Sequence, residues 1–481
     1  MEATAPHSVV SGGKQKWADL RWWAGLLLGV GAGLFFWFGP RLAALSVAGQ
    51  HGLALMVMTV FFWVFRVADE AVAGLLFIVA VIGLKVMPSA DLLVDWTGPN
   101  MWFAISAFIL GAAVYEAGMI RRLCYHLLLR VPNSFAGLTV TVFVIQALFT
   151  FMGVAGSFAR VALLYPLMLE IAQASGLSRE GKAFKGLAIA VMASGEPVML
   201  LSYTGFWLNP LAMKLSGSSS FYYSDWLRLF AVPALGLAVA TWLVVWLMYR
   251  SDEALTIPRQ ELKERLTQMG PLWQNRRELR AVLYFLGILA LWLTDSYHHV
   301  DPGWIAVLGA CLFMFPRIGV IDLMTGMKSV KWPIVLFLGA AFGLGKMVQA
   351  LGINRWLGRI FLPSSAPHSV ILLVLIVSFV SVVLHLMTGD VASAMSVTIP
   401  TIAGYAKALG FNPLVFGFIS YVNCWEQYLF PFQNAGVLMA YGYGYFSAKD
   451  ILKVGLALTI AVPLSLLVIA LPYWSLLGVL R

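Results

Sequence analysis

The chain has 481 residues, of which 60% are apolar and 11% are charged, whereas an average soluble domain is roughly 45–50% apolar and about 25% charged. This composition excludes an ordinary soluble fold. The formal net charge of +10 does not indicate a nucleic-acid partner, because the basic residues lie in short segments between apolar runs, where lipid headgroups are the expected partners.

Apolar runs long enough to cross about 30 Å of hydrocarbon, which takes about 20 residues in a helix, recur along the whole chain. Because alternating strand patterns are absent, we predict an all-α polytopic membrane protein with about 11 spans. The first spans are predicted at residues 22–38, 53–65, 71–86 and 101–119. The three cysteines have no metal-ligand spacing, so we expect neither a metal site nor a cofactor.

The basic and acidic segments between the spans predict how the chain is oriented. Residues 121–130 are basic and are expected in the cytoplasm, as is the polar segment 250–280. Residues 295–303 contain no Lys or Arg and are expected outside. This alternation puts the N-terminus inside, but it also puts Arg355 and Arg359 outside, against the positive-inside rule.

An internal repeat divides the chain into two related halves. A shift of 234 residues superposes several Gly and Pro positions over about 60 residues: Gly118 on Gly352, Pro166 on Pro400, and Gly176 on Gly410. An odd number of membrane crossings between equivalent points would make the second copy inverted, which is the usual arrangement in secondary transporters. We therefore predict two inverted repeats.

Each half contains a pair of apolar arms that are short for separate spans. The arms are residues 138–152 and 161–174 in the first half, and residues 370–386 and 394–408 in the second. Small and polar residues between the arms predict re-entrant hairpins, whose tips are tolerated in a membrane only where they face protein or a water-filled cavity. The alternative is two short ordinary spans joined by a tight turn.

Each half also contains a helix interrupted by Gly, Pro and polar residues, at 194–205 and 424–436. Broken helices direct helix ends and free carbonyls at bound ions. Glu196 and Glu426 occupy matching places in the two breaks, and an ionisable group inside a span is a functional candidate because its burial is costly. Both could take up a proton or a cation, or each could pair with a basic residue to join two helices.

Arg160 follows the first hairpin tip, and Asp390 lies at the second. A guanidinium binds two oxygens of a carboxylate or oxyanion at once, so Arg160 is the leading candidate for the anion ligand. The alternative is an ion pair between Arg160 and Asp390. As a carboxylate, Asp390 is also a candidate for the coupling ion or proton.

Uncharged polar residues accompany the same tips and breaks. We assign Ser157, Thr204, Thr388 and Asn434 to the substrate and Gln433 to the coupling ion. A single hydroxyl in a helix often bonds back to its own chain instead. We predict no catalytic residues and no structural or catalytic metal. The expected coupling ion is Na⁺ or H⁺.

The segment 430–455 (FPFQNAGVLMAYGYGYFSAKDILKVG) resembles the closing signature of the divalent anion:sodium symporter family. Residues 61–77 are similar to the connection between that family's second and third spans, and residues 101–122 to its fourth span. The family lies within the ion transporter superfamily of dicarboxylate, citrate, sulfate and arsenite carriers. The resemblance implies a two-repeat carrier of the elevator type with a dimeric scaffold.

The chain departs from the family pattern at the tips and the breaks. Members carry Ser-Asn-Thr at each tip and Thr-Pro-Pro type breaks. The matching positions here are Gly156-Ser157-Phe158 and Asp390-Val391-Ala392 at the tips, and Thr204-Gly205-Phe206 and Asn434-Ala435-Gly436 at the breaks. These changes leave the coupling ion open between Na⁺ and H⁺, and the additional charges favour proton coupling or a divergent substrate.

We divide the chain into a cytoplasmic N-terminal segment (1–21), N-terminal spans (22–99), a first repeat (100–249), a cytoplasmic linker (250–280), spans that open the second half (281–330), and a second repeat with the last span (331–481).

The predicted function is secondary active transport of a small anion, either a di- or tricarboxylate or an inorganic oxyanion, by a homodimer in a bacterial inner membrane. No nucleotide-binding P-loop occurs, so we expect an ion gradient to drive transport and no enzyme activity. The alternatives are a cation/proton antiporter of the same superfamily and a membrane scaffold or sensor that has lost transport.

Overall fold

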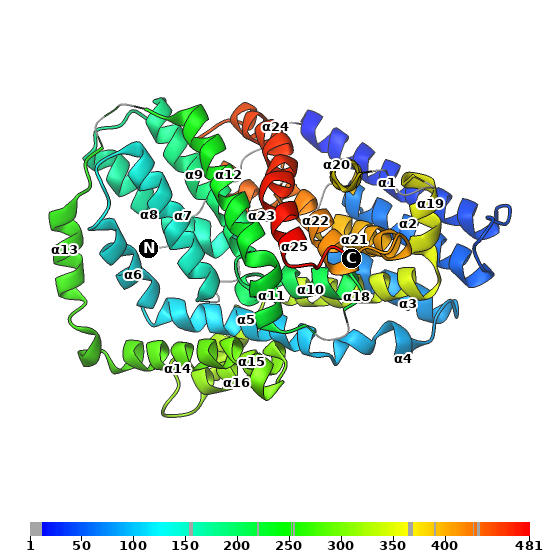
Figure 1. The fold of residues 1–481 in the computed structure, drawn as a ribbon, viewed down its shortest axis with the longest axis horizontal. Helices are drawn as coiled ribbons and strands as arrows, with labels where there is room; N and C mark the ends of the chain where they lie inside the picture. The colour runs from blue at the N-terminus through cyan, green and yellow to red at the C-terminus, as the bar shows by residue number, and fades with distance from the viewer. Residues whose placement is uncertain are drawn as a thin grey trace.

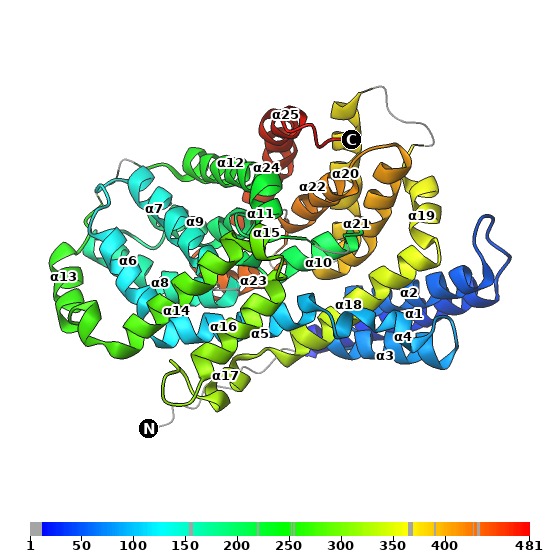
Figure 2. The same cartoon turned by 60° about the horizontal axis from the view of Figure 1, so that its bottom comes forward.

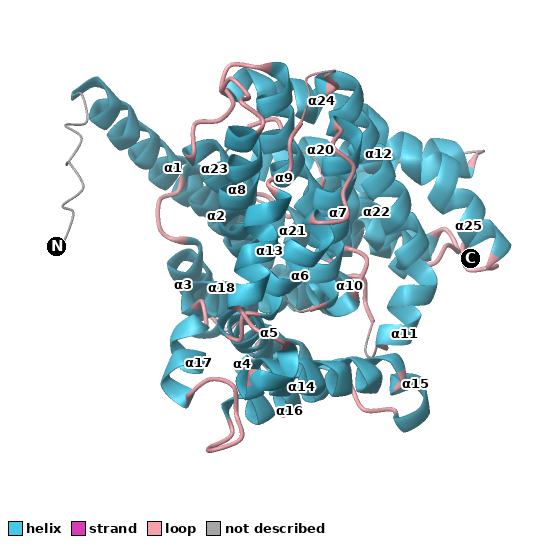
Figure 3. Cartoon of the chain, turned by 90° about the vertical axis from the view of Figure 1, so that its left-hand side faces the viewer, coloured by secondary structure: helices cyan, strands magenta, loops and turns pink. Residues whose placement is uncertain are grey.

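The computed structural model describes residues 12–152, 157–218, 221–251, 253, 255–363, 369–388, 391–426, 428–430 and 433–481. Within these residues the regular structure is entirely helical (Figure 3). This confirms the predicted all-α class. The helices lie along several directions, and α6, α7, α8 and α13 occupy one end of the molecule while α2, α3, α4 and α19 occupy the other (Figure 1).

The first half and the linker contain α1 (Gly12–Phe38), α2 (Val47–Phe65), α3 (Glu70–Gly83), α4 (Ser89–Leu92), η1 (Val94–Trp96), α5 (Pro99–Glu116), α6 (Met119–Leu128), α7 (Phe135–Phe151), α8 (Ser157–Ala174), α9 (Lys182–Met199), η2 (Tyr203–Gly205), α10 (Leu208–Leu215), α11 (Tyr223–Trp226), α12 (Val232–Tyr249) and α13 (Arg259–Gln268).

The second half contains α14 (Arg276–Leu293), α15 (Asp295–His298), α16 (Pro302–Met314), α17 (Leu323–Ser329), α18 (Trp332–Ala350), α19 (Ile353–Phe361), α20 (Val370–Thr388), α21 (Val391–Ala408), α22 (Pro413–Trp425), α23 (Ala435–Gly442), α24 (Ala448–Ser465) and α25 (Leu471–Leu476).

Six helical stretches among the described residues are long and apolar enough to cross a membrane: Leu20–Phe38, Val47–Phe65, Val94–Glu116, Tyr223–Tyr249, Trp332–Ala350 and Ala448–Leu476. Shorter apolar helices include α3, α7, α16, most of α20, and α22. Both α7 and α20 are predicted hairpin arms; α7 has 17 residues, whereas α20 has 19, the same length as α2 and α18.

The two halves repeat the same order of helices. The second hairpin arms, α8 and α21, begin and end at positions that differ by the 234 residues of the sequence repeat, since Ser157–Ala174 corresponds to Val391–Ala408. Each of these helices contains one internal proline. If α7–α8 is counted as a hairpin and α9 and α14 are counted as crossings, five crossing helices separate α6 from α19, namely α9, α12, α14, α16 and α18. This arrangement inverts the second copy.

Glycines at matching positions set the boundaries of the repeated helices. Gly118 caps the start of α6 with φ = 83°, and Gly352 caps the start of α19 with φ = 72°. This left-handed conformation is favoured by glycine because glycine has no Cβ. The superposed glycines of the sequence repeat therefore mark equivalent chain reversals.

Helices of one half pack against helices of the other. Helix α3 contacts α18, and its counterpart α16 contacts α5. In the same way α10 contacts α21 and α22, whereas its counterpart α23 contacts α8 and α9 (Figures 1 and 2). The segment that follows each broken helix is thus buried against the hairpin of the other half, which brings both breaks to the middle of the molecule.

The polar linker is attached to the first half by ion pairs. Arg122 of α6 forms two hydrogen bonds with the buried carboxylate of Glu278, at 2.6 and 2.8 Å, and donates to the Gly270 carbonyl at 2.9 Å. Arg265 of α13 bonds Glu170 of α8 at 2.9 Å. Bidentate guanidinium–carboxylate pairs fix orientation as well as distance, so the linker is held against α6 and α8.

Candidate functional site

The predicted hairpin arms and helix breaks are present in the described residues. Helix α9 ends at Met199 and the chain resumes as η2 and α10, while α22 ends at Trp425 and the chain resumes at α23. The residues at the predicted tips, 153–156 in the first half and 389–390 in the second, lie outside the described part of the structure.

Arg160, near the start of α8, is fully buried. Its Nη1 donates to the Gln146 carbonyl at 3.0 Å and to Thr150 Oγ1 at 2.9 Å, and its Nη2 donates to the Gly205 carbonyl at 3.4 Å. These acceptors belong to α7 and to the break after α9, so Arg160 joins the hairpin to the broken helix. The three hydrogen bonds fix the position of the buried guanidinium, and the carboxylate of Glu196 acts on its charge.

The break at Gly205 is packed too tightly for any larger residue. A Cβ at this position would lie 2.3 Å from Thr150 Cγ2 and 2.6 Å from the Met199 carbonyl oxygen. Gly205 therefore allows its carbonyl to approach Arg160 between two fixed neighbours. This is the position at which the sequence departs from the Thr-Pro-Pro type of break.

Glu196 lies within α9, one residue before Pro197, and only 1% of its surface is exposed. It interacts electrostatically with Arg160 and Asn434. Its backbone carbonyl accepts a hydrogen bond from Trp425 Nε1 at 3.0 Å. Because Trp425 directly precedes Glu426, this bond connects the two breaks and brings the two predicted glutamates together.

Glu426 is the residue directly after the end of α22, and its side chain is fully buried. Within the described residues, neither of its carboxylate oxygens accepts a hydrogen bond. Glu196 acts on it electrostatically, and both glutamates act on Tyr421. A carboxylate in such surroundings is stable only when a proton or a cation neutralises it, because burying an uncompensated charge costs several kcal/mol.

The two uncharged residues of the second break hold its backbone. Asn434 Oδ1 accepts from the amides of Gly436 at 2.8 Å and Val437 at 3.4 Å, which caps the start of α23. Gln433 Oε1 accepts from the amides of Leu429 at 2.6 Å and Phe430 at 2.8 Å. In the described structure Asn434 Nδ2 is buried with no acceptor at full hydrogen-bond geometry, and the side chain of Asn434 acts on the Glu196 carboxylate.

Thr204 belongs to a hydroxyl chain on the other side of the first break. Its Oγ1 lies 3.1 Å from Ser202 Oγ, which in turn lies 2.9 Å from the Tyr223 hydroxyl. Two residues that the sequence did not single out connect the halves here. Tyr421 donates to Asn209 Oδ1 at 2.6 Å, and Asn209 Nδ2 donates to the Met199 and Ser202 carbonyls.

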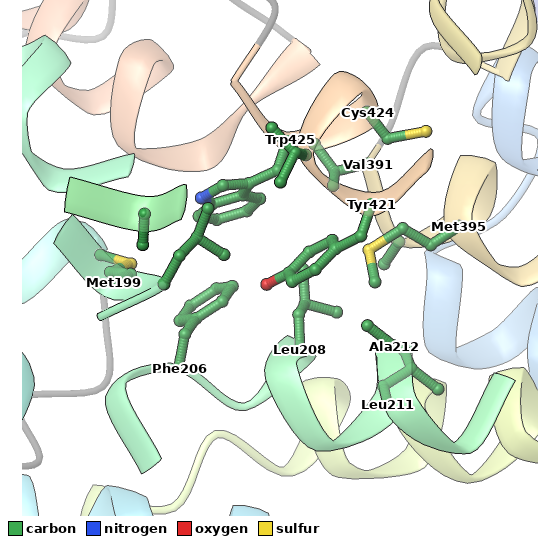
Figure 4. Close-up of a cluster of buried hydrophobic side chains, with 14 of the residues drawn as sticks. Met199, Phe206, Leu208, Leu211, Ala212, Val391, Met395, Tyr421, Cys424 and Trp425 are labelled. Carbon is green, nitrogen blue, oxygen red and sulfur yellow. The ribbon is translucent and has the colours of Figure 1, made fainter. Parts of the chain in front are cut away.

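Buried hydrophobic side chains of the two halves form an apolar wall where α10 meets α21 and α22 (Figure 4). The rings of Phe206 and Trp425 are 4.6 Å apart, so the residues that follow Gly205 and precede Glu426 pack against each other. Leu208 and Leu211 of α10 approach Tyr421 and Met395 from the second half. Buried apolar side chains of this kind lower the local dielectric constant, which strengthens the interactions of buried charges.

Three predicted residues cannot be placed in this geometry. The side chains of Ser157 and Thr388, and all of Asp390, lie outside the described residues. The predicted ion pair between Arg160 and Asp390 therefore stays a prediction. Among the described residues, the structure brings together one guanidinium, Arg160, and two carboxylates, Glu196 and Glu426, at the junction of the two halves.

Comparison with known proteins identifies the family. The family model described as "Sodium:sulfate symporter transmembrane region" matches residues 20–480. The inner membrane protein YbhI of Escherichia coli is 21% identical over 85% of this chain and 86% of its own length. The chloroplastic dicarboxylate transporter 2 of Spinacia oleracea is 22% identical over 94% of this chain and 82% of its own length.

A solved structure has the same fold. The YdaH transporter of Alcanivorax borkumensis superposes with a TM-score of 0.52 and 14% sequence identity, covering 89% of this chain and 99% of that chain. Together with the family model, this confirms the resemblance found in the sequence. The chain belongs to the sodium:sulfate symporter family and is a multi-pass membrane transporter rather than an enzyme.

Proposed function

We propose that the protein is a secondary active transporter that carries a small anion, either a di- or tricarboxylate or an inorganic oxyanion, together with Na⁺ or H⁺. The observation that carries this proposal is the buried junction of Arg160, Glu196 and Glu426, to which both broken helices contribute. Support also comes from the family description, which names sodium and sulfate, and from the plant relative, which is named a dicarboxylate transporter.

The charges of this junction favour coupled movement of an anion and a cation. Among the described residues, one guanidinium faces two carboxylates, so an ionised junction has an excess negative charge. An anion that binds Arg160 would add to this excess. Binding is therefore favourable only if a proton or a metal cation enters with the anion, because an unbalanced charge is costly to bury. This requirement is the physical basis of the proposed coupling.

A cation/proton antiporter is the second candidate function. It is favoured by the three neutral acceptors that Arg160 already contacts, since these bonds also fit a guanidinium that only neutralises Glu196. In that case the two glutamates would bind the transported cation, and no anion would be carried. A scaffold or sensor without transport would carry neither an anion nor a cation.

Uptake into proteoliposomes distinguishes these functions. The purified protein is reconstituted, and uptake of labelled succinate and labelled sulfate is followed under an imposed sodium gradient or proton gradient. We expect at least one of the two anions to accumulate above equilibrium under one of the gradients. Cation-driven proton movement without anion uptake would support the antiporter instead, and the absence of both would support the scaffold.

We further propose that transport proceeds by an elevator-type movement of the hairpins and breaks against the remaining helices, in a homodimer in a bacterial inner membrane. Two contacts join α10 to the helices that would stay fixed. Lys214 forms an ion pair with Asp95 of η1 at 2.8 Å, and Gln349 of α18 donates to the Leu215 carbonyl at 2.8 Å. The E. coli relative is named an inner membrane protein.

Cross-linking the first of these contacts tests the movement. In a Cys311→Ser background, which removes the one exposed cysteine of the described chain, the double variant Asp95→Cys/Lys214→Cys is treated with a bifunctional thiol reagent. We expect uptake to fall at least tenfold and to return on reduction, because a covalent link prevents the elements from separating. Each single variant, treated identically, serves as the control. Full uptake by the linked protein would contradict the proposed movement.

A further inference from the structure

An open apolar groove of about 500 Å³ lies between the end of α19 and the middle of α20. It is lined by Ile360, Phe361 and Leu362 on one side and by Leu375, Ile376 and Phe379 on the other. Several of these side chains are well exposed, including Phe379 at 70%. In a membrane protein, an exposed surface of this kind is covered by lipid chains.

Two arginines lie on α19, and one of them, Arg359, is next to the groove, whereas the guanidinium of Arg355 lies against Gly352 at the start of the helix. Arg355 and Arg359 are four residues apart, so they share one face of the helix, and both are exposed. Arg359 directly precedes the groove residue Ile360. In the described part of the chain neither arginine takes part in an ion pair or a side-chain hydrogen bond. The opposite face of α19 is anchored by the buried Ile353 and Leu357.

We propose that this groove and the two arginines form a binding site for an anionic phospholipid. An acyl chain would occupy the apolar groove, and the phosphate would lie on the guanidinium of Arg359, whose geometry suits two oxygens at once, while Arg355, one turn earlier on the same face, would turn from Gly352 toward the headgroup. This site also accounts for the position of the arginines in the sequence. Both fall on the predicted outer side of the membrane, where basic residues are disfavoured, so a specific headgroup partner compensates for their placement.

The site lies away from the junction of Arg160 and the glutamates, and it involves α19, which connects α18 to the second hairpin. A lipid held between α19 and α20 would contact both the helix that precedes the hairpin and the first hairpin arm. The proposed lipid site does not depend on the proposed transport function. Its test measures lipid binding and requires no uptake of an anion.

Native mass spectrometry of the full-length protein in detergent tests the site. The protein is titrated with phosphatidylglycerol and with phosphatidylcholine of identical chains. We expect a preference for phosphatidylglycerol that falls roughly tenfold to thirtyfold in the variant Arg355→Gln/Arg359→Gln, as each basic residue near a membrane surface contributes about 1 kcal/mol to the attraction of anionic lipid.

The matched control is Arg121→Gln/Arg130→Gln, which removes the same charge from exposed positions around α6, the counterpart of α19. An equal loss in both double variants would show that the attraction is spread over the surface, and it would overturn the proposal. A third variant, Ile376→Trp, fills the groove without changing charge. We expect it to weaken binding of phosphatidylglycerol, and unchanged binding would also overturn the proposal.

Discussion

Replacing Arg160 with glutamine is expected to lower the initial rate of anion uptake by about 100-fold. Arg160 is fully buried and is the basic residue that acts on Glu196. A hydrogen bond to a charged group contributes about 1.5–3 kcal/mol, and each 1.36 kcal/mol corresponds to about a tenfold change in rate. Loss of one such bond to the anion therefore accounts for most of the effect. The measurement is uptake of labelled succinate and sulfate into proteoliposomes.

Two further variants separate binding of the anion from stability of the fold. Arg160→Lys keeps the charge but loses the planar fork, so we expect partial uptake with a higher KM for the anion. Thr150→Val removes one hydrogen-bond acceptor of Arg160, which lies at 2.9 Å, and leaves the charge in place. A neutral bond contributes about 0.5–1.5 kcal/mol, so uptake should fall only about threefold to tenfold.

The control for charge is Arg179→Gln, which removes an exposed arginine from the loop after α8. All variants are compared by size-exclusion profile in detergent, because removal of a buried charged residue also destabilises the fold. If the Arg160→Gln protein is monodisperse and takes up the anion with an unchanged KM, Arg160 does not bind the substrate. The antiporter would then be the better assignment.

Much of the fold is visible in the sequence because Gly and Pro constrain the backbone directly. The positive φ of Gly118 and Gly352 and the internal prolines of α8 and α21 recur at the spacing found by superposing the two halves. The packing of α10 against α21 and α22 was not predicted. Apolar runs in a membrane are hydrophobic on all sides, so their pattern does not show which helix meets which.

The predicted site was recognised through its charges, and the structure brings Arg160, Glu196 and Glu426 together. Two acceptors of Arg160 are backbone carbonyls, at Gln146 and Gly205, and side-chain patterns do not reveal such groups. The third acceptor, Thr150, could have been predicted from the sequence. Gln146 and Thr150 are polar residues four apart in an apolar run, so they share one face of the helix.

The hydrogen-bond partners of Thr204 and Asn209 depend on tertiary contacts. Thr204 belongs to a hydroxyl chain with Ser202 and Tyr223, and Tyr223 follows it by 19 positions. Similarly, Asn209 and Tyr421 form a hydrogen bond across the two halves. Neither pair has a local sequence pattern. Their identification requires the packing of broken helices against the opposite hairpin, which no spacing rule gives.

Replacing Glu426 with glutamine is expected to abolish gradient-driven accumulation of the anion while exchange of internal for external anion continues. Glutamine has nearly the same shape as glutamate, but it neither takes up a proton nor carries the charge that attracts a cation. Glu426 is fully buried, and within the described residues its carboxylate accepts no hydrogen bond. Its removal therefore leaves no described partner unpaired, and it relieves the excess negative charge of the junction.

Two assays on the same proteoliposomes measure this difference. Accumulation under an imposed sodium or proton gradient should fall at least tenfold in Glu426→Gln, whereas counterflow of labelled anion without a gradient should stay within about threefold of wild type, since the proposed anion ligand Arg160 is unchanged. The gradient that drives accumulation in the wild type identifies the coupling ion. Glu180→Gln, which neutralises an exposed glutamate, is the matched control.

The pattern of loss decides what Glu426 does. If accumulation and exchange fall together in a monodisperse Glu426→Gln protein, the carboxylate supports the shape of the junction and does not carry the coupling ion. If neither falls, Glu196 becomes the remaining described candidate, and Glu196→Gln is tested in the same two assays. If accumulation is lost and exchange is kept, the charge of Glu426 is neutralised once in each transport cycle. Only a group that binds and releases the driving ion is needed for accumulation and not for exchange.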